Sequence, residues 1–217
     1  MVKIAPSILA ADFLHLENDI LMLNDHADLI HFDVMDGSLV PNLSFGFPIL
    51  DAVAPIACIP LDVHLMIVNP DKYIERFAQA GASNISFHLE AADEAGKDVS
   101  EYIDLARRCG AQAGVAIDPD VPVERLFPYM EDADFFLIMS VFAGFGGQKF
   151  IGESVERIAA LRAEMDRRSI SKDIEVDGGV SGTNARMLID SGATILVAGS
   201  SVFKAADPAQ TIFELRG

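Results

Sequence analysis

The chain has 217 residues, of which 51% are hydrophobic, and its formal net charge at pH 7 is −17. With 33 acidic and 16 basic residues it carries no basic stripe that could neutralise phosphates, which argues against a nucleic-acid partner. No apolar run reaches the ~18 residues of a membrane helix, so we expect no membrane association. Because the N-terminus leads directly into a predicted strand, we expect no secretory signal and a cytoplasmic location. The two cysteines, Cys58 and Cys109, fit no metal-binding spacing and are expected to be reduced and partly buried.

Eight short apolar runs, each ending in polar residues or glycines, follow one another along the chain. The runs cover residues 3–9, 29–36, 60–67, 84–90, 112–118, 135–141, 173–179 and 195–201. Segments with the spacing of amphipathic helices separate them. This alternation of strand and helix indicates parallel pairing with right-handed crossovers. Eight repeats without a linker predict one (β/α)8 barrel domain, the TIM-barrel fold, over residues 1–217.

Between the strands, the first helix is predicted over residues 12–26, with Asp12 as its N-cap and Phe13 on its apolar face. Two longer loops follow the second and sixth strands, at residues 37–46 and 142–150. In a barrel both loops lie at the carboxyl ends of the strands, which is where such barrels carry their catalytic groups.

Four titratable residues lie near the ends of the predicted strands two, three and seven. They are His31, Asp33, His64 and Asp177. Side chains alternate across a strand, so His31 and Asp33 point the same way. Any one of the four alone is more often a core group or a helix cap, but four together on the active face favour a functional site. Their mixture of nitrogen and oxygen ligands suits Zn²⁺, Fe²⁺, Mn²⁺ or Co²⁺, although spacing alone does not identify a reaction.

Glycine-rich segments follow strands six, seven and eight. They contain Gly144, Phe145, Gly146 and Gly147, then Gly178 and Gly179, then Gly199 and Ser200. Glycine lets the backbone approach a ligand closely, and the loops after strands seven and eight usually bind phosphate in these barrels. Because the chain is acidic, a phosphate would have to be held locally by backbone N–H groups. The loop at 142–150 is also predicted to act as a lid.

Six segments of the sequence carry a resemblance to one family. They are APSILAADF (5–13), IHFDVMDGSLVPNLSFG (30–46), LDVHLMI (61–67), GFGGQKF (144–150), IEVDGGV (174–180) and VAGSSVF (197–203). Together they closely resemble the ribulose-phosphate 3-epimerase family, over essentially the whole chain. The resemblance implies a TIM barrel of the ribulose-phosphate-binding type. It also implies 3-epimerisation of D-ribulose 5-phosphate to D-xylulose 5-phosphate, by two-base proton transfer at C3 through an enediolate.

The resemblance assigns roles to individual residues. His31, Asp33, His64 and Asp177 would bind one divalent metal ion, and Asp33 and Asp177 would be the two acid/base groups. Substrate would be bound by Ser7, His64, Gly144, Phe145, Gly146, Gly147, Asp177, Gly178, Gly179, Gly199 and Ser200. Apart from the resemblance, Met35, Met66 and Met139 lie on strands two, three and six, where they could simply fill the core; we favour the interpretation that they form soft pocket walls that exclude water. On sequence alone, a turn hydroxyl is an equally good interpretation of Ser7.

Two further residues at a strand end, His88 and Glu90, could orient the metal ligands. A buried, hydrogen-bonded pair without a catalytic role is the favoured interpretation. The chain departs from the family pattern at Phe142, at Phe47 and at Asp118, which stands in place of a usual asparagine. Phe142 and Phe47 are expected to reshape the pocket or lid. The sequence therefore identifies the type of reaction more closely than the sugar substrate.

Three other functions are alternatives to this one. An epimerase for a hexulose phosphate such as D-allulose 6-phosphate ranks second. A decarboxylase or aldolase would need a lysine in the third strand, which here reads Asp62-Val63-His64. A non-catalytic phosphate-binding barrel would not need two opposed aspartates. The expected partner is a small phosphorylated ketose, and the chain is expected to form a homo-oligomer.

Overall fold

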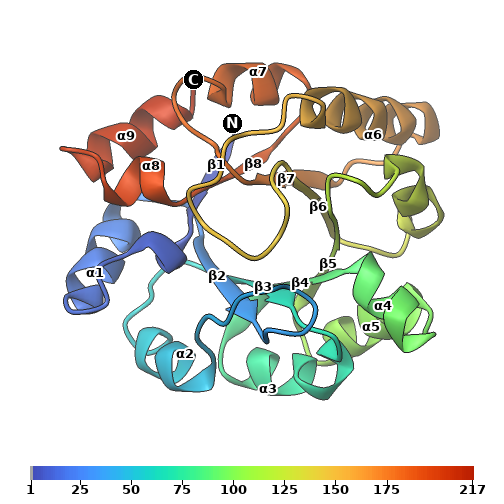
Figure 1. The fold of residues 1–217 in the computed structure, drawn as a ribbon, viewed down its shortest axis with the longest axis horizontal. Helices are drawn as coiled ribbons and strands as arrows, with labels where there is room; N and C mark the ends of the chain where they lie inside the picture. The colour runs from blue at the N-terminus through green and yellow to red at the C-terminus, as the bar shows by residue number, and fades with distance from the viewer. Residues whose placement is uncertain (1) are drawn as a thin grey trace.

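The computed structural model describes residues 2–217 and contains one sheet of eight parallel strands. The strands are β1 (Lys3–Pro6), β2 (Ile30–Met35), β3 (Leu61–Met66), β4 (Ala82–His88), β5 (Gln112–Ile117), β6 (Phe135–Met139), β7 (Asp173–Asp177) and β8 (Ile195–Ala198). Their hydrogen-bonded order is β1-β8-β7-β6-β5-β4-β3-β2, and a parallel bridge between Ser7 and His31 joins the two ends. Figure 1 shows the strands as an inner ring with helices outside. The predicted TIM barrel is therefore confirmed.

The helices alternate with the strands. They are α1 (Leu16–His26), α2 (Phe47–Val53), α3 (Ile74–Gln79), α4 (Leu89–Ala95), α5 (Val99–Arg108), α6 (Ser154–Arg168), α7 (Ala185–Asp190), α8 (Ser200–Phe203) and α9 (Pro208–Leu215). Three 3-10 helices are η1 (Ile8–Ala10), η2 (Pro70–Lys72) and η3 (Val123–Tyr129). Among the described residues, no helix is long and apolar enough to cross a membrane.

Most of the strands are shorter than the apolar runs that predicted them. The polar or glycine-rich end of a run leaves the sheet and forms the loop above it, as at Gly178 and Gly199. β4 is the exception at its start, because it begins at Ala82, before the predicted run. Every residue of β2 and β3 is buried, because one face packs on helices and the other fills the barrel. This accounts for the high hydrophobic content.

The prediction for the first helix is wrong at its start. α1 begins at Leu16, and Asp12 does not cap it. Instead, Asp12 accepts a hydrogen bond from the Leu14 N–H at 3.0 Å and contacts His15 at 2.8 Å, which makes a turn that competes with helix. Phe13 thus lies before the helix and packs on Phe45, with ring centroids 5.2 Å apart.

The two cysteines are both free, but only Cys109 is partly buried. Cys58 is exposed, so the prediction of its burial is wrong. It lies in the segment between the end of α2 and the start of β3. Neither thiol lies in a cluster of potential metal ligands within residues 2–217.

Candidate active site at the carboxyl ends of the strands

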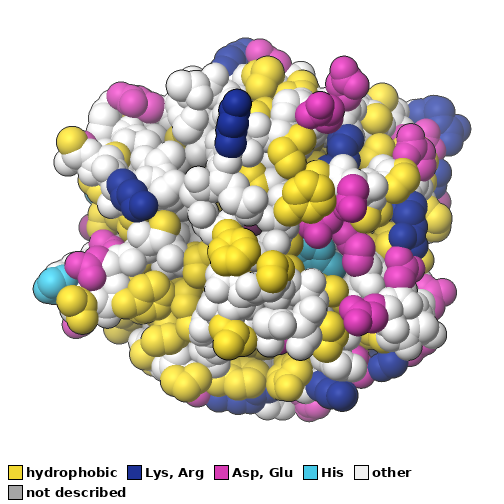
Figure 2. All heavy atoms as spheres, viewed as in Figure 1, with side chains coloured by type: hydrophobic (Ala, Val, Ile, Leu, Met, Phe, Trp, Pro, Cys, Tyr) yellow, Lys and Arg dark blue, Asp and Glu magenta, His cyan; other side chains and the backbone are white. Residues whose placement is uncertain are grey.

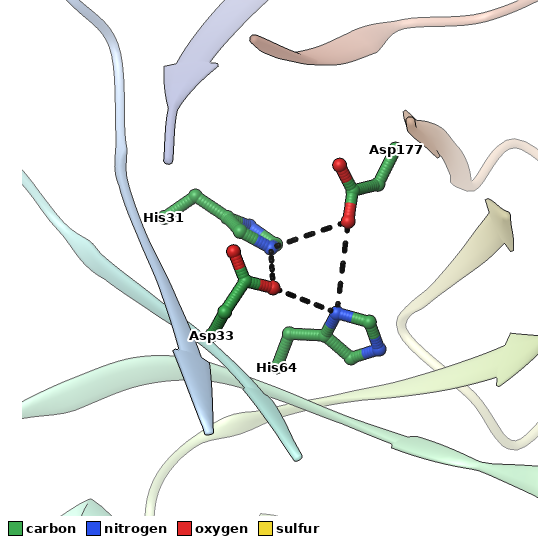
Figure 3. A group of neighbouring side chains, drawn as sticks. All are labelled: His31, Asp33, His64 and Asp177. Atoms are coloured by element: carbon green, nitrogen blue, oxygen red, sulfur yellow. Dashed lines mark hydrogen bonds and ion pairs between the residues drawn. The ribbon is translucent and has the colours of Figure 1, made fainter. Parts of the chain in front are cut away.

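Three strands bring the four predicted titratable side chains to one point. Alternate residues of β2 supply His31 and Asp33, β3 supplies His64, and the last residue of β7 is Asp177. The register between β2 and β3 sets Asp33 beside His64. Figure 3 shows all four side chains directed toward one another. Their potential ligand atoms lie within 4.8 Å of one another.

The distances inside this cluster suit a metal ion. Asp33 Oδ1 lies 3.3 Å from His31 Nε2 and 3.3 Å from His64 Nδ1. Asp177 Oδ2 lies 4.0 and 3.9 Å from the same two nitrogens. Metal–ligand bonds of ~2.0–2.1 Å in a tetrahedral site place neighbouring ligand atoms about 3.3 Å apart. In addition, His31 Nε2 is buried and has no hydrogen-bond partner among the described residues. The cluster could therefore hold a divalent metal ion.

A second buried group lies behind His31, on the side away from the cluster. His31 Nδ1 lies 2.7 Å from Asp62 Oδ2 and 3.5 Å from Glu175 Oε1. All three side chains are fully buried. Burial and the charge of Asp62 raise the pKa of Glu175 well above its usual range, so Glu175 is neutral. An Nδ1–H donated to Asp62 leaves Nε2 directed at the cluster, where it would offer a lone pair to an ion after losing its proton. Sequence reasoning missed Glu175, although its spacing from Asp177 places it on the same face of β7.

The titratable groups of the cluster have very different proton affinities. Burial raises the pKa of Asp33, but the two neighbouring histidines outweigh burial and hold it well below its usual range. Burial and the charge of Asp33 raise the pKa of Asp177 to about 7. Burial lowers the pKa of His64 to about 4, so this ring is neutral. Burial also lowers the pKa of His31, but Asp33 and Asp62 outweigh it and raise that pKa well above its usual range. Near neutral pH, one aspartate is thus ionised and the other is close to half-protonated.

A cavity of about 420 Å³ opens above the cluster. Most of the residues predicted to contact substrate line it: Ser7, Asp33, Met35, Met66, Met139, Gly144, Phe145, Gly146, Gly147, Asp177, Gly178, Gly179, Gly199 and Ser200. His31 and His64 do not line the cavity and are fully buried. Ser7 Oγ lies 2.5 Å from Asp33 Oδ2, so Ser7 contacts a member of the cluster. Lys204 also lines the cavity and was missed by sequence reasoning.

The glycines around the cavity fall into two kinds. A Cβ on Gly178 would lie 2.5 Å from Val141 Cγ2, and one on Gly179 would lie 2.7 Å from Phe150 N. Both have positive φ, so packing and backbone conformation require glycine there. A Cβ on Gly146 would instead have Leu9 Cδ2 as its nearest neighbour, at 3.8 Å. The sequence had given no reason to separate these positions.

The loop at 142–150 crosses the mouth of the barrel, drawn in yellow at the centre of Figure 1. Asn42 Nδ2 donates to Gly144 O at 2.7 Å, which ties this loop to the loop after β2. Figure 2 shows hydrophobic side chains gathered at the centre of this face. The exposed large hydrophobic residues of the two loops are Leu43, Phe142 and Phe145.

Of the predicted departures, Phe142 does line the cavity, but Phe47 does not. Phe47 begins α2 and packs on Phe77, with ring centroids 4.6 Å apart, so it lies on the helical layer. Asp118 Oδ1 accepts a hydrogen bond from Ala143 N at 3.1 Å and supports the start of the loop. The expectation that Phe47 shapes the pocket is therefore wrong.

The pair at the end of β4 is also arranged differently from the favoured interpretation. His88 is buried, but its close contact is with His64, at 2.9 Å between the two Nε2 atoms. Its Nδ1 lies 3.8 Å from Glu90 Oε2, beyond hydrogen-bond distance. His88 therefore adjoins the candidate metal centre, which sequence spacing could not reveal.

The chain is similar to known proteins over essentially its whole length. Residues 3–203 match the model of the "Ribulose-phosphate 3 epimerase family". A protein of Bacillus subtilis named ribulose-phosphate 3-epimerase is 45% identical over 100% of this chain and 99% of its own length. Proteins of the same name from Synechocystis and Mycobacterium bovis are 44% and 41% identical, covering 99% and 98% of this chain and 93% and 91% of their own length.

Solved structures give the same fold. The tryptophan synthase α-subunit of Pyrococcus furiosus is 18% identical with a TM-score of 0.71, and each chain is covered in full. The N-(5'-phosphoribosyl)anthranilate isomerase of the same organism is 16% identical with a TM-score of 0.68, covering 100% of this chain and 98% of its own. At these identities the likeness concerns the barrel alone. The family model and the curated relatives, in contrast, show that the chain belongs to the ribulose-phosphate 3-epimerase family.

Proposed function

We propose that the protein catalyses metal-dependent 3-epimerisation of D-ribulose 5-phosphate to D-xylulose 5-phosphate. The observation that carries the proposal is the pair Asp33 and Asp177, which meet at the floor of one cavity with opposite shifts in proton affinity. Inversion at C3 removes a proton from one face of the sugar and returns one to the other. An ionised carboxylate can accept the first proton while a protonated one donates the second.

The two aspartates exchange these roles with the direction of reaction. Asp33, held ionised by the adjacent histidines, suits the base for one epimer. Asp177, whose pKa is about 7 in the metal-free protein, exchanges its proton most readily near neutral pH, so it suits the acid in this direction and the base in the reverse one. In either direction, C3 loses a proton from one face to form the enediolate, and it then gains a proton on the opposite face.

His31, Asp33, His64 and Asp177 would hold the divalent ion, which we propose to be Zn²⁺, Fe²⁺, Mn²⁺ or Co²⁺. When bound, such an ion supplies Lewis acidity toward the C2 carbonyl and C3 hydroxyl oxygens. Fit to the ion is supported by His31 Nε2, which is buried without a hydrogen-bond partner among the described residues, and by the ligand-atom distances. His31 and His64 are buried below the cavity, so they orient ligand atoms without contacting bulk water.

Apolar side chains would keep water away from the reacting carbon. Met35, Met66 and Met139 line the cavity, and each is at least 94% buried. Exclusion of water protects the enediolate from stray protonation and strengthens the charge interactions around it. The loop at 142–150 would complete this exclusion by closing over bound substrate.

The phosphate would bind on the side of the cavity formed by the loops after β7 and β8. Gly179, Gly199 and Ser200 bring backbone close to the cavity there. Lys204 at the rim adds a positive charge near these loops. In a chain of net charge −17, one such local cation matters for attracting a dianion.

A hexulose phosphate remains the second candidate, because Phe142 lines the cavity in place of the family's usual residue. A cytoplasmic location is also proposed, by analogy with the rice relative named as a cytoplasmic isoform, 41% identical over 99% of this chain. Assembly into a homo-oligomer and a single domain over residues 1–217 stay predictions.

The test is turnover in deuterated water. Purified protein is given D-ribulose 5-phosphate, and the recovered sugars are analysed by mass spectrometry and NMR. We expect D-xylulose 5-phosphate with deuterium at C3, no activity after chelation of metal, and slower turnover of D-allulose 6-phosphate. Turnover without exchange at C3, or full activity in a metal-free sample, would overturn the mechanism.

A further inference from the structure

Two imidazole rings on neighbouring strands share one hydrogen bond. His64 Nε2 and His88 Nε2 are 2.9 Å apart, and the rings are nearly parallel, at 18°. A hydrogen bond between two ring nitrogens needs a hydrogen on one and a lone pair on the other. When both rings are neutral, the tautomer of one therefore dictates the tautomer of the other.

The metal position fixes the direction of this bond. His64 Nδ1 faces Asp33 Oδ1 at 3.3 Å and Asp177 Oδ2 at 3.9 Å. It can bind a metal ion only through its lone pair, so the hydrogen of the neutral ring must sit on Nε2. His64 then donates to His88, whose own hydrogen must sit on Nδ1.

An acceptor for that last hydrogen is in place. Glu90 Oε2 lies 3.8 Å from His88 Nδ1 and is buried without a hydrogen-bond partner among residues 2–217. The other oxygen, Oε1, already accepts from Asp118 N at 2.7 Å, so Oε2 is the free one. A movement of about 1 Å brings the pair to hydrogen-bond distance.

We propose that His88 and Glu90 are positioning residues, which hold His64 in the tautomer that directs its Nδ1 lone pair at the metal position. The proposal rests on the metal site of the proposed function. It extends the arrangement at His31, where a carboxylate contacts the ligand histidine directly, by inserting one more imidazole.

An alternative role for His88 and Glu90 is to bind a second metal ion. Ligand atoms of His88, Glu90 and Asp118 lie within 4.8 Å of one another, and Figure 2 shows histidine atoms bordered by acidic side chains over the ends of β4 and β5. A metal on His88 Nδ1 would put the ring hydrogen on Nε2. The hydrogen bond would then require a lone pair on His64 Nε2 and a hydrogen on His64 Nδ1, which would remove a ligand from the first site. The geometry thus favours the positioning role.

The discriminating variant is Glu90→Gln. In the glutamine, the oxygen still accepts from Asp118 N, and the amide NH₂ replaces the free oxygen opposite His88. Because NH₂ donates, it favours a lone pair on His88 Nδ1 and reverses the direction of the whole chain of hydrogen bonds. We expect the affinity for Zn²⁺ to fall ~10–100-fold, the range for loss of a partner behind a metal ligand.

Two further variants separate positioning from packing. His88→Gln keeps one acceptor and one donor and should retain more Zn²⁺ affinity than His88→Leu, which has neither. Asp118→Asn removes a nearby charge but keeps the oxygen that accepts from Ala143 N, and it should bind Zn²⁺ as the unchanged protein does. Thermal unfolding of each metal-free variant checks that the fold is retained.

The direct readout is NMR of the Zn²⁺-loaded protein with ¹⁵N-labelled histidines. Long-range ¹H–¹⁵N correlations should place the hydrogen of His64 on Nε2 and that of His88 on Nδ1. Unchanged Zn²⁺ affinity in Glu90→Gln, or the opposite tautomers, overturns the proposal. So does binding of two Zn²⁺ ions per chain with His88 as a ligand. None of these measurements uses substrate, so a protein that binds Zn²⁺ in this way but does not epimerise would contradict the proposed function alone.

Discussion

The two histidines of the candidate metal centre are supported in different ways. Behind His31, Asp62 lies at 2.7 Å and both side chains are completely buried. Behind His64, the nearest partner is another imidazole, and the carboxylate beyond it, Glu90, has 24% of its side chain exposed. His31 thus depends on direct contact with a fully buried carboxylate, and His64 on a second imidazole and a carboxylate from a partly exposed side chain.

This difference separates stability from metal binding. Around His31, loss of the partner leaves a buried N–H that water cannot reach, so folding and metal affinity should suffer together. Around His64, the outer carboxylate belongs to the partly exposed side chain of Glu90, so metal affinity should change more than stability. A change behind the ligand histidine of β2 should therefore alter both stability and metal affinity, whereas a change behind the one of β3 should alter mainly metal affinity.

The largest effect on turnover is expected at Asp33 and Asp177, the two carboxylates that both histidines face. Asp33→Asn and Asp177→Asn should each lower turnover by more than ~10²-fold, because each removes an acid/base group from one face of the sugar. Steady-state kinetics at measured Zn²⁺ occupancy is the check, since asparagine can still act as a ligand. Full turnover in either variant at full occupancy would show that the assigned aspartate carries no proton.

The contrast between the two histidines is tested most directly by Asp62→Leu. We expect the affinity for Zn²⁺ to fall ~10–100-fold. We also expect the free energy of unfolding of the metal-free protein to fall by about 1–3 kcal/mol, because His31 Nδ1–H loses its acceptor. Asp62→Asn keeps an acceptor and is the matched control. Zn²⁺ titration and urea unfolding measure both quantities, and a stability loss in Glu90→Gln equal to that in Asp62→Leu would contradict the contrast.

The two rings also differ in charge, which makes Zn²⁺ binding depend on pH. In the metal-free protein the pKa of His31 is raised well above its usual range, while burial holds that of His64 at about 4. Asp177, with a pKa of about 7, also keeps part of its proton. Zn²⁺ must displace the protons of His31 and Asp177, so its affinity rises with pH through neutrality, by about tenfold per pH unit for each proton displaced.

Calorimetry in buffers of different ionisation enthalpy counts these protons. Above a pH of about 7 the contribution of Asp177 should disappear while that of His31 persists. Asp177→Asn should remove the first contribution and leave the second. Proton release that is independent of pH across this range would show that Asp177 is already ionised.

Sequence reasoning predicted what depends on local pattern and missed what depends on register and rotamer. The alternation along β2 put His31 and Asp33 on one face, and the glycine-rich strand ends marked the cavity loops. The pairing of His31 with Asp62, however, follows from the register between β2 and β3. The contact of His88 with His64 depends on how two side chains turn inside the barrel. Phe47 was misplaced because a residue in a loop and one that begins a helix look alike in sequence.

The smallest expected effect lies on the phosphate side, where the two kinds of glycine differ. Gly146→Val adds a side chain that meets only Leu9 near its first carbon, so stability should be retained while the KM for D-ribulose 5-phosphate rises. Gly179→Val is not its equivalent, because a Cβ there would meet Phe150 N at 2.7 Å and the backbone has a φ of +63°. That variant should displace residues 148–150 and lower the free energy of unfolding. Because the metal ligands are untouched in Gly146→Val, its Zn²⁺ affinity should equal that of the unchanged protein. An unaltered KM would mean that the loop at 142–150 does not contact the phosphate, and would assign phosphate binding to the loops after β7 and β8 alone.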